Sequence, residues 1–106
     1  MQRFITNYTI VPPGCVLTNH ITEVDSNGRL TSIKPVDEEL AYTAYVPNPL
    51  LVAPSHALQQ VLQMVESASY VQPLCELLAT IPAINPHEQV VVLELFFDRH
   101  NYRRLV

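Results

Sequence analysis

Short apolar segments, rich in β-branched and aromatic residues and separated by turn residues, fill the first half of the chain. This pattern predicts β-strands, because such side chains fit a pleated, half-buried surface. Pro12-Pro13-Gly14 and Asn27-Gly28 mark turns, since proline removes backbone donors and glycine tolerates a positive φ. Pro47 and Pro49 indicate that the last segment is an edge or irregular strand. The strands expected in this half cover residues 3–11, 16–24, 29–34 and 42–52.

From Ser55 onward the apolar positions follow a helical period. Leu58 begins a stripe of apolar residues at i, i+3, i+4, i+7 and i+10, which predicts an amphipathic helix of about four turns. Ser55 is expected to cap this helix. Ser69 is expected to cap a second helix, in whose first turn Pro73 is tolerated. The apolar residues of the second helix are Val71, Leu74, Cys75, Leu77, Leu78 and Ile81.

The apolar segment at residues 88–97 fits either a strand or a helix. Asn85-Pro86-His87-Glu88 resembles a capping box, which favours a helix. Three valines and two phenylalanines favour a strand, and this is the prediction adopted here, with a short final strand at residues 102–106. Segments this apolar must return to the N-terminal sheet to be buried.

The expected fold is therefore α+β: a mainly antiparallel β-sandwich or open barrel with two helices inserted before the last strands. At 106 residues the chain has the size of a single domain. Within residues 1–106 we expect a β-rich half at 1–54, a helical pair at 55–82 and returning strands at 88–106.

Charged residues are scarce, at 15% against about 25% in typical domains, although 48% of residues are hydrophobic. Such a chain is expected to expose apolar surface to a second copy or another protein. The net charge of −4 and the absence of a basic cluster argue against nucleic acid or a membrane surface as partner. No apolar run is long enough to span a bilayer, and the N-terminus does not resemble a signal peptide.

These features predict a cytoplasmic protein with reduced thiols. Cys15 and Cys75 have no metal-binding spacing, and a disulfide between them remains an alternative. The histidines, His20, His56, His87 and His100, likewise lack ligand spacing. We therefore expect no metal, no cofactor and no catalytic residues.

Several segments together carry a resemblance to a known architecture: residues 5–11, residues 21–25, Asn27-Gly28-Arg29-Leu30 leading to Ile33, residues 50–54, residues 90–94 and Arg103-Arg104-Leu105-Val106. They resemble the composite β-sandwich of the metal-dependent amidohydrolase superfamily, in which strands from both ends of the chain flank a catalytic barrel. The resemblance implies a sandwich without that barrel, since only about 35 residues stand where the family has a barrel of roughly 250. The family's metal histidines would align with Gln60 and Leu62, and Ser55 replaces its usual glycine.

The resemblance and the low charge together predict a non-catalytic interaction module that self-associates or docks on a protein partner. The alternatives are an auxiliary or remnant piece of a metal-dependent hydrolase acting on C–N bonds, and a small ligand-binding protein. Because we expect one small sheet to cover only one of two apolar helix faces, we expect a homodimer; a monomer with both helices on one sheet face is the alternative. The candidate interface residues are Leu58, Val61, Leu62, Val65, Tyr42 and Tyr45.

Overall fold

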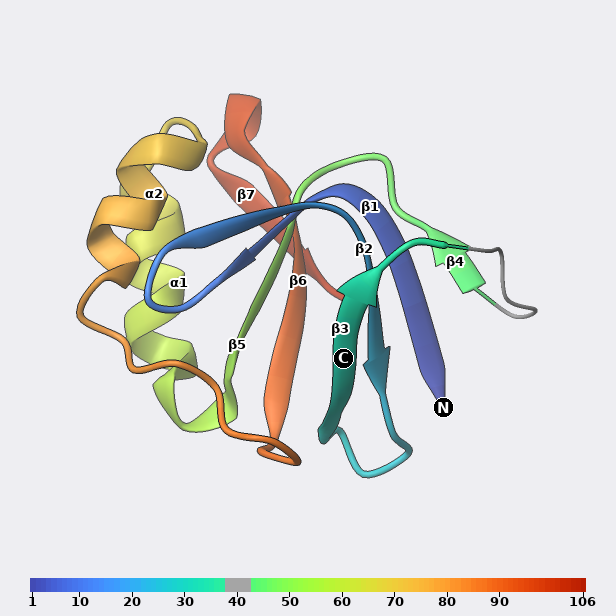
Figure 1. Cartoon of the computed structure of the whole chain (residues 1–106). Helices are drawn as coiled ribbons and strands as arrows, with labels where there is room; N and C mark the ends of the chain where they lie inside the picture. The colour runs from blue at the N-terminus through green and yellow to red at the C-terminus, as the bar shows by residue number, and fades with distance from the viewer. Residues whose placement is uncertain (38–42) are drawn as a thin grey trace.

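The structure, a computed structural model, describes residues 1–37 and 43–106. Two α-helices and seven strands make up the described chain, which confirms the α+β class (Figure 1). In chain order the elements are β1 (Gln2–Val11), β2 (Cys15–Val24), β3 (Leu30–Pro35), β4 (Thr43–Tyr45), β5 (Leu50–Pro54), a 3-10 turn (Ser55–Ala57), α1 (Leu58–Ser67), α2 (Val71–Leu78), β6 (Val90–Phe96), a second 3-10 turn (Phe97–Arg99) and β7 (Asn101–Arg104).

All strands belong to one sheet, in the order β3-β2-β1-β5-β6-β7, with β4 paired to β1. The pairings are antiparallel except those of β1 with β4 and β5, so the mainly antiparallel sheet is confirmed. The apolar segment before the C-terminus is the strand β6, as predicted, and it pairs with β5 and β7. The two helices lie between β5 and β6 in the sequence, which is the expected insertion point.

The proline-containing segment before β5 is irregular, as predicted, but β5 is not an edge strand. Arg3 of β1 pairs with Thr43, and Thr9, later in the same strand, pairs with Leu50. Pro47 and Pro49 fall between these two pairings. Since neither proline lies inside a ladder, β5 keeps the backbone donors that it needs to lie between β1 and β6.

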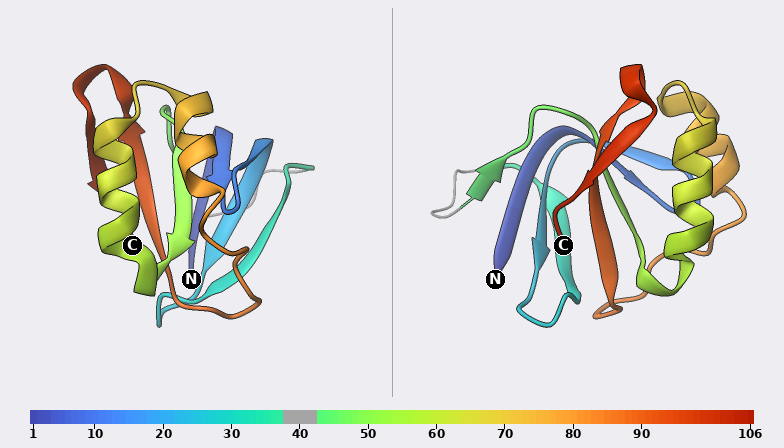
Figure 2. Two further views of the ribbon diagram at one scale, coloured as in Figure 1. Left: turned by 90° about the vertical axis from the view of Figure 1, so that its left-hand side faces the viewer. Right: turned by 180° about the vertical axis from the view of Figure 1, so that it is seen from behind.

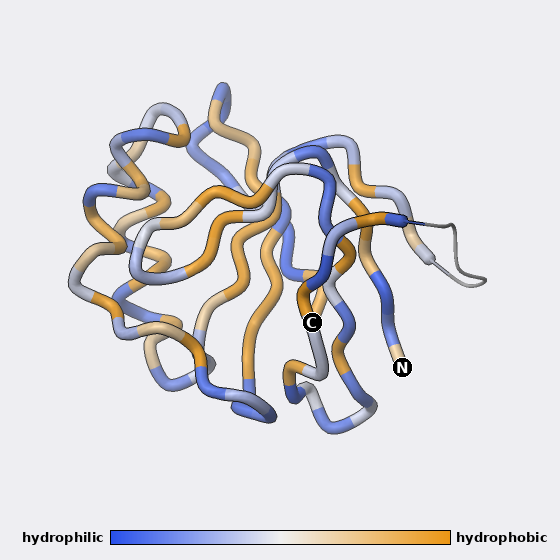
Figure 3. Tube along the Cα trace, in the orientation of Figure 1, coloured by the Kyte–Doolittle hydropathy of each residue, from blue (hydrophilic) through white to orange (hydrophobic). Residues whose placement is uncertain are grey.

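Two apolar cores lie on opposite faces of the central strands, because successive residues of β5 and β6 point in opposite directions. Figure 3 shows that both strands are apolar over most of their length. The helix-side core contains the buried residues Ile10, Leu51, Ala53, Ala57, Val61, Val65, Ala68, Leu74, Leu78, Ile81, Val91, Leu93 and Leu95. The strand-side core contains Phe4, Val24, Val46, Leu50, Val52, Val90 and Val92.

Both helices cover the same face of the sheet (Figure 2). Val61 and Val65 of α1, and Leu74 and Leu78 of α2, are buried there. The expectation that one sheet would cover only one helix face was therefore wrong. The two helices are short and lie against each other, so β5, β6 and the end of β1 suffice to cover them.

The expected helix caps were also wrong. Ser55 begins a 3-10 turn rather than the α-helix, which starts at Leu58 without a side-chain cap. The second helix starts after Tyr70, again without a side-chain cap. In both cases the buried apolar face, and not a hydroxyl at the start, positions the helix.

The strand-side core is enclosed because the sheet curls (Figures 1 and 2). The Val90 N–H donates to the Gly28 carbonyl at 2.9 Å, and the Leu30 N–H donates to the Glu88 carbonyl at 3.0 Å. These bonds join the start of β3 to the residues that lead into β6. On another side, the Leu105 N–H donates to the Val92 carbonyl at 2.8 Å, so residues after β7 also pack on this core.

Candidate functional site

An apolar pocket opens into the strand-side core. It has a volume of about 260 Å³ and is lined by three segments that are distant in sequence. These are the end of β1 with the following proline, β3, and the connection between α2 and β6. The lining residues are Val11, Pro12, Leu30, Ile33, Ala83 and Ile84, and all six are apolar.

Backbone contacts fix the positions of two of these walls. The Leu30 N–H donates a hydrogen bond to the Glu88 carbonyl at 3.0 Å, and the Leu30 carbonyl accepts one from the His87 N–H at 3.2 Å. Val11 is the last residue of β1 and pairs with Cys15 across the hairpin. The turn that follows Ile84 is closed by Glu88, whose carboxylate accepts a hydrogen bond from the Asn85 N–H at 2.9 Å. This is the contact that gave residues 85–88 the look of a helix cap, although no helix follows.

Two threonine hydroxyls in the strand-side core have no hydrogen-bond partner among the described residues. They belong to Thr9 and Thr22, and both residues are fully buried. Thr9 pairs with Leu50, and Thr22 pairs with Phe4 and with the pocket residue Ile33. Paired residues of neighbouring strands share a face, so both hydroxyls face the strand-side core. An unsatisfied buried hydroxyl costs about 1–3 kcal/mol, which makes them unusual positions in this core.

A third polar group on this face, Glu94, is fully engaged. Its side chain is 2% exposed and accepts hydrogen bonds from Arg103 Nη2 at 2.7 Å and Asn48 Nδ2 at 3.0 Å. The Asn48 carbonyl in turn accepts a hydrogen bond from the Thr6 hydroxyl at 3.0 Å. The chain of contacts joins β1, the segment before β5, β6 and β7, so its role is to hold these strands together.

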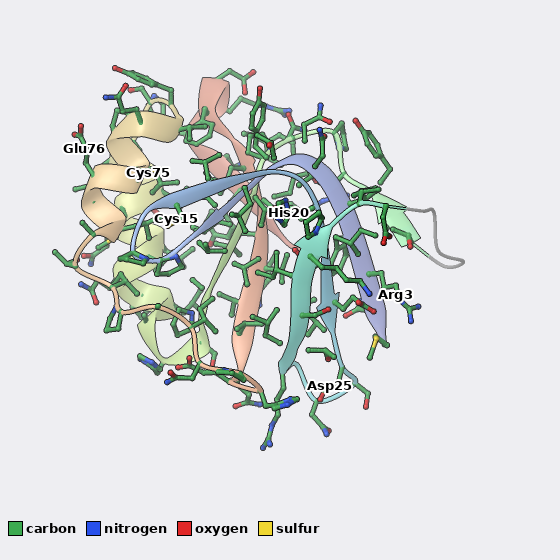
Figure 4. The ribbon with its side chains drawn as sticks, viewed as in Figure 1. Arg3, Cys15, His20, Asp25, Cys75 and Glu76 are labelled. Carbon is green, nitrogen blue, oxygen red and sulfur yellow. The ribbon has the colours of Figure 1, made fainter. Side chains whose placement is uncertain are left out.

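Glu23 forms a second engaged cluster, across β1, β2 and β3. Its carboxylate accepts hydrogen bonds from Lys34 Nζ at 3.0 Å, Ser32 Oγ at 2.8 Å and Arg3 Nε at 2.9 Å. The bond from Lys34, followed by those from Ser32 and Arg3, lowers the pKa of Glu23 from 4.5 to about 2, against the opposing effect of burial. Such a carboxylate stays ionised near neutral pH and is poorly suited to general acid–base chemistry. Figure 4 labels Arg3, the donor that β1 contributes to this cluster.

The histidines do not gather at one place. His20 Nδ1 lies 2.9 Å from the Thr18 carbonyl, and His56 Nε2 lies 3.3 Å from a Glu88 oxygen. Within the described residues, no three His, Cys, Asp or Glu side chains form a group that could hold a metal ion. Gln60, at one position where the resemblance would place a metal ligand, is exposed, and Leu62, at the other, packs against the helix-side core.

The candidate interface residues fall into different environments. Val61 and Val65 are 0% and 3% exposed, so they offer no surface to a partner. Leu58 and Leu62 are partly buried against the helix-side core. Tyr45, on β4, is 63% exposed, whereas Tyr42 lies outside the described residues. The described candidates therefore do not form one exposed patch.

Sequence reasoning did not identify the pocket, and only a weak signal was available. Val11-Pro12 and Ala83-Ile84 are apolar pairs next to prolines, in segments where turns are usually polar. Which strand faces them depends on how the sheet curls. Neither helix, in the part of the chain described, is long and apolar enough to cross a membrane. Comparison of the chain with models of known protein families and with curated proteins gave no match.

Proposed function

We propose that this chain is a non-catalytic binding domain whose pocket holds a small aliphatic molecule. The observation that carries the proposal is the convergence of six apolar residues from three separate segments around a space of about 260 Å³. Ligand pockets typically measure about 300–1,000 Å³, so this pocket lies just below the usual range and suits only a small ligand. Of the functions expected from the sequence, the geometry favours ligand binding over docking through the helices, because Val61 and Val65 of α1 and Leu74 and Leu78 of α2 are buried in the helix-side core.

The chemistry of the pocket walls supports binding rather than catalysis. None of the six lining side chains carries a nucleophile or a titratable group. The two buried carboxylates nearby, Glu23 and Glu94, are occupied by hydrogen bonds and ion pairs from their neighbours. Specificity in such a site would come from shape and from apolar contact.

A homologous series of linear alcohols provides the test, by calorimetric titration of the whole chain. Each methylene removed from water contributes about 0.8 kcal/mol, so affinity should rise about fourfold per carbon until the pocket is full. Ala83→Phe should weaken binding at least about tenfold by filling the pocket mouth. Ala79→Phe, on an exposed position of the same connection, should bind like the unchanged protein. Absence of saturable binding across the series would contradict the proposal.

A relation to the composite sandwich of amidohydrolases remains part of the proposal. It is supported by the pairing of β5, which precedes the helices, with β6, which follows them, so that both ends of the chain contribute to one sheet. The strand-side core, enclosed by one curled sheet whose β3 and β6 regions are joined by hydrogen bonds, supports either expected form, a sandwich or an open barrel. Co-purification with a barrel-bearing hydrolase from the native source would favour an auxiliary role in that enzyme.

Self-association also remains a proposal, with a different surface from the expected one. Tyr45 is the described candidate with the most exposed side chain, and Leu58 and Leu62 retain part of theirs. A homodimer would therefore use the β4 side or the margin of α1. Light scattering at micromolar concentration tests this, and a mass that stays near 12.0 kDa on concentration would reject the dimer. The cytoplasm is the proposed location, supported by the two free cysteines.

A further inference from the structure

The tip of the β1–β2 hairpin rests directly on helix α2. A β-carbon on Gly14 would lie 2.5 Å from the carbonyl oxygen of Cys75 and 3.6 Å from its Cα, so only glycine permits this approach. The next residue after Gly14 is Cys15, the first residue of β2. Figure 4 shows Cys15 at the hairpin and Cys75 on the neighbouring helix. The contact of Gly14 with Cys75 places Cys15, the other cysteine of the chain, near Cys75, and Cys15 influences the Cys75 thiol electrostatically.

The two thiols differ in exposure, which sets the order in which they react, although the raised pKa of Cys75 lowers its thiolate fraction and slows the second step. Both are free; Cys15 is exposed and Cys75 is half-buried. Burial is the main cause that raises the pKa of Cys75, and the nearby Cys15 adds to it. Cys15 is therefore the thiol that a reagent in solution reaches first, and Cys75 is placed to react with it afterwards.

The segments next to the two cysteines both contribute lining residues to the pocket. Val11, a lining residue, pairs with Cys15 across the hairpin. Ala83 and Ile84 belong to the connection that leaves α2 a few residues after Cys75. A covalent link between hairpin and helix would thus restrict how far these walls can separate.

We propose that Cys15 and Cys75 form a reversible disulfide that fastens the hairpin to α2 and restricts entry to the pocket. The oxidant is a low-molecular-weight disulfide such as oxidised glutathione. The Cys15 thiolate attacks one sulfur of the oxidant, forms a mixed disulfide and releases one thiolate. The Cys75 thiolate then attacks the Cys15 sulfur, closes the protein disulfide and releases the second thiolate. The protein loses two hydrogens, and the oxidant is reduced to two thiols.

The bridge needs the two Cα atoms within about 7 Å, and Gly14, adjacent to Cys15, is already in contact with Cys75. The experiment incubates the whole chain in glutathione buffers and measures its mass without reduction. The expected product is a monomer that has lost two hydrogens and carries no glutathione. Cys15→Ser and Cys75→Ser should each stop at a mixed disulfide or remain reduced.

A displaced cysteine provides the matched control. Tyr8 is 49% exposed and pairs with Thr18, away from the hairpin tip that contacts Cys75. The double variant Cys15→Ser, Tyr8→Cys should therefore hold glutathione without passing it to Cys75. A mixed disulfide that persists in the unchanged protein, or covalent dimers in place of the internal bridge, would overturn the proposal.

The effect on the pocket rests on the proposed function and has its own measurement. Alcohols of increasing length are titrated into the reduced and the oxidised protein. The oxidised form should bind at least about tenfold more weakly, with affinity restored by a dithiol reductant, and Cys15→Ser should not respond. Equal affinities of the two forms would overturn the restriction of entry. If the reduced protein binds no alcohol, the proposed function fails, and the mass measurement still decides whether the disulfide forms.

Discussion

Glu23 shows how strongly one side chain depends on its neighbours. Three donors from β1 and β3 converge on its carboxylate, and they hold its pKa at about 2. Because the folded-state pKa lies below the ordinary value of 4.5, the ionised form stabilises the fold at neutral pH. That contribution is lost as the pH falls from about 4.5 towards 2.

Glu23→Gln should lower the free energy of unfolding at neutral pH by about 1–2 kcal/mol, because Arg3 and Lys34 lose their charged partner. The difference from the unchanged protein should shrink as the pH falls through the same range, since both then carry a neutral side chain. Urea denaturation at several pH values measures it. Glu66→Gln, on an exposed position of α1, is the control and should change stability little at any of these pH values.

The Thr22 hydroxyl has no hydrogen-bond partner among the described residues, so removing it should stabilise the protein, whereas Glu23→Gln should destabilise it. Thr22→Val should raise the free energy of unfolding by about 1 kcal/mol, because it removes a buried hydroxyl and keeps the side-chain shape. Thr6→Val is the matched variant and should lower it by about 1 kcal/mol, because the Thr6 hydroxyl donates to the Asn48 carbonyl. Shifts of the urea midpoint at constant slope report both effects. Equal destabilisation by the two variants would mean that Thr22 has a partner in solution.

At the scale of single elements, the hairpin tip depends on a glycine for two reasons. Gly14 has a φ of +115°, and an added β-carbon would meet the Cys75 carbonyl oxygen at 2.5 Å. Gly14→Ala should therefore lower the free energy of unfolding by about 2–4 kcal/mol. Gly28→Ala is the control: its φ is +77° but the space around it is open, so the cost should be about 1 kcal/mol. Both variants carry the backbone strain of a positive φ, but only Gly14→Ala adds a steric clash with Cys75. The difference between their losses of stability in thermal unfolding therefore measures the clash.

Helix α2 offers a second matched pair, in two consecutive leucines. Leu78 is fully buried in the helix-side core, whereas Leu77 is 39% exposed. Leu78→Ala should cost about 2–5 kcal/mol, and Leu77→Ala much less, because only the first leaves a cavity between helix and sheet. Similar losses at both positions in a denaturation experiment would indicate that another molecule covers the outer face of α2.

The elements differ in how far their sequence determines them. The strand character of β6 could be predicted, because three valines and the phenylalanines at 96 and 97 outweigh the cap-like residues 85–88, although Phe97 itself begins the 3-10 turn after the strand. Pro47 and Pro49 predicted the irregular segment before β5. They did not predict that β5 lies inside the sheet, because that depends on which half of β1 the strands β4 and β5 each pair with. The helix starts predicted from Ser55 and Ser69 were wrong, since tertiary packing and not a side-chain cap sets where each helix begins.

At the scale of the whole molecule, the sequence predicted the α+β class and the site of the helix insertion. It did not predict that both helices share one sheet face, because periodicity shows which side of a helix is apolar but not how much sheet is available to cover it. Val61 and Val65 were therefore assigned to an interface and are found in the core. The pocket was beyond prediction for a related reason. Its walls come from three distant segments, and only the curl of the sheet brings them together.

The position of β1 also has a consequence for the time course of folding. β1 is the first strand along the chain but lies in the middle of the sheet, between β2 and β5. The β1–β2–β3 meander pairs residues that are close in sequence, whereas β1–β5 and β5–β6 join residues that are far apart. The meander can therefore form early, but the helix-side core must wait for β6. Refolding after dilution from urea should accordingly take roughly milliseconds to seconds, as in other domains dominated by distant strand pairings.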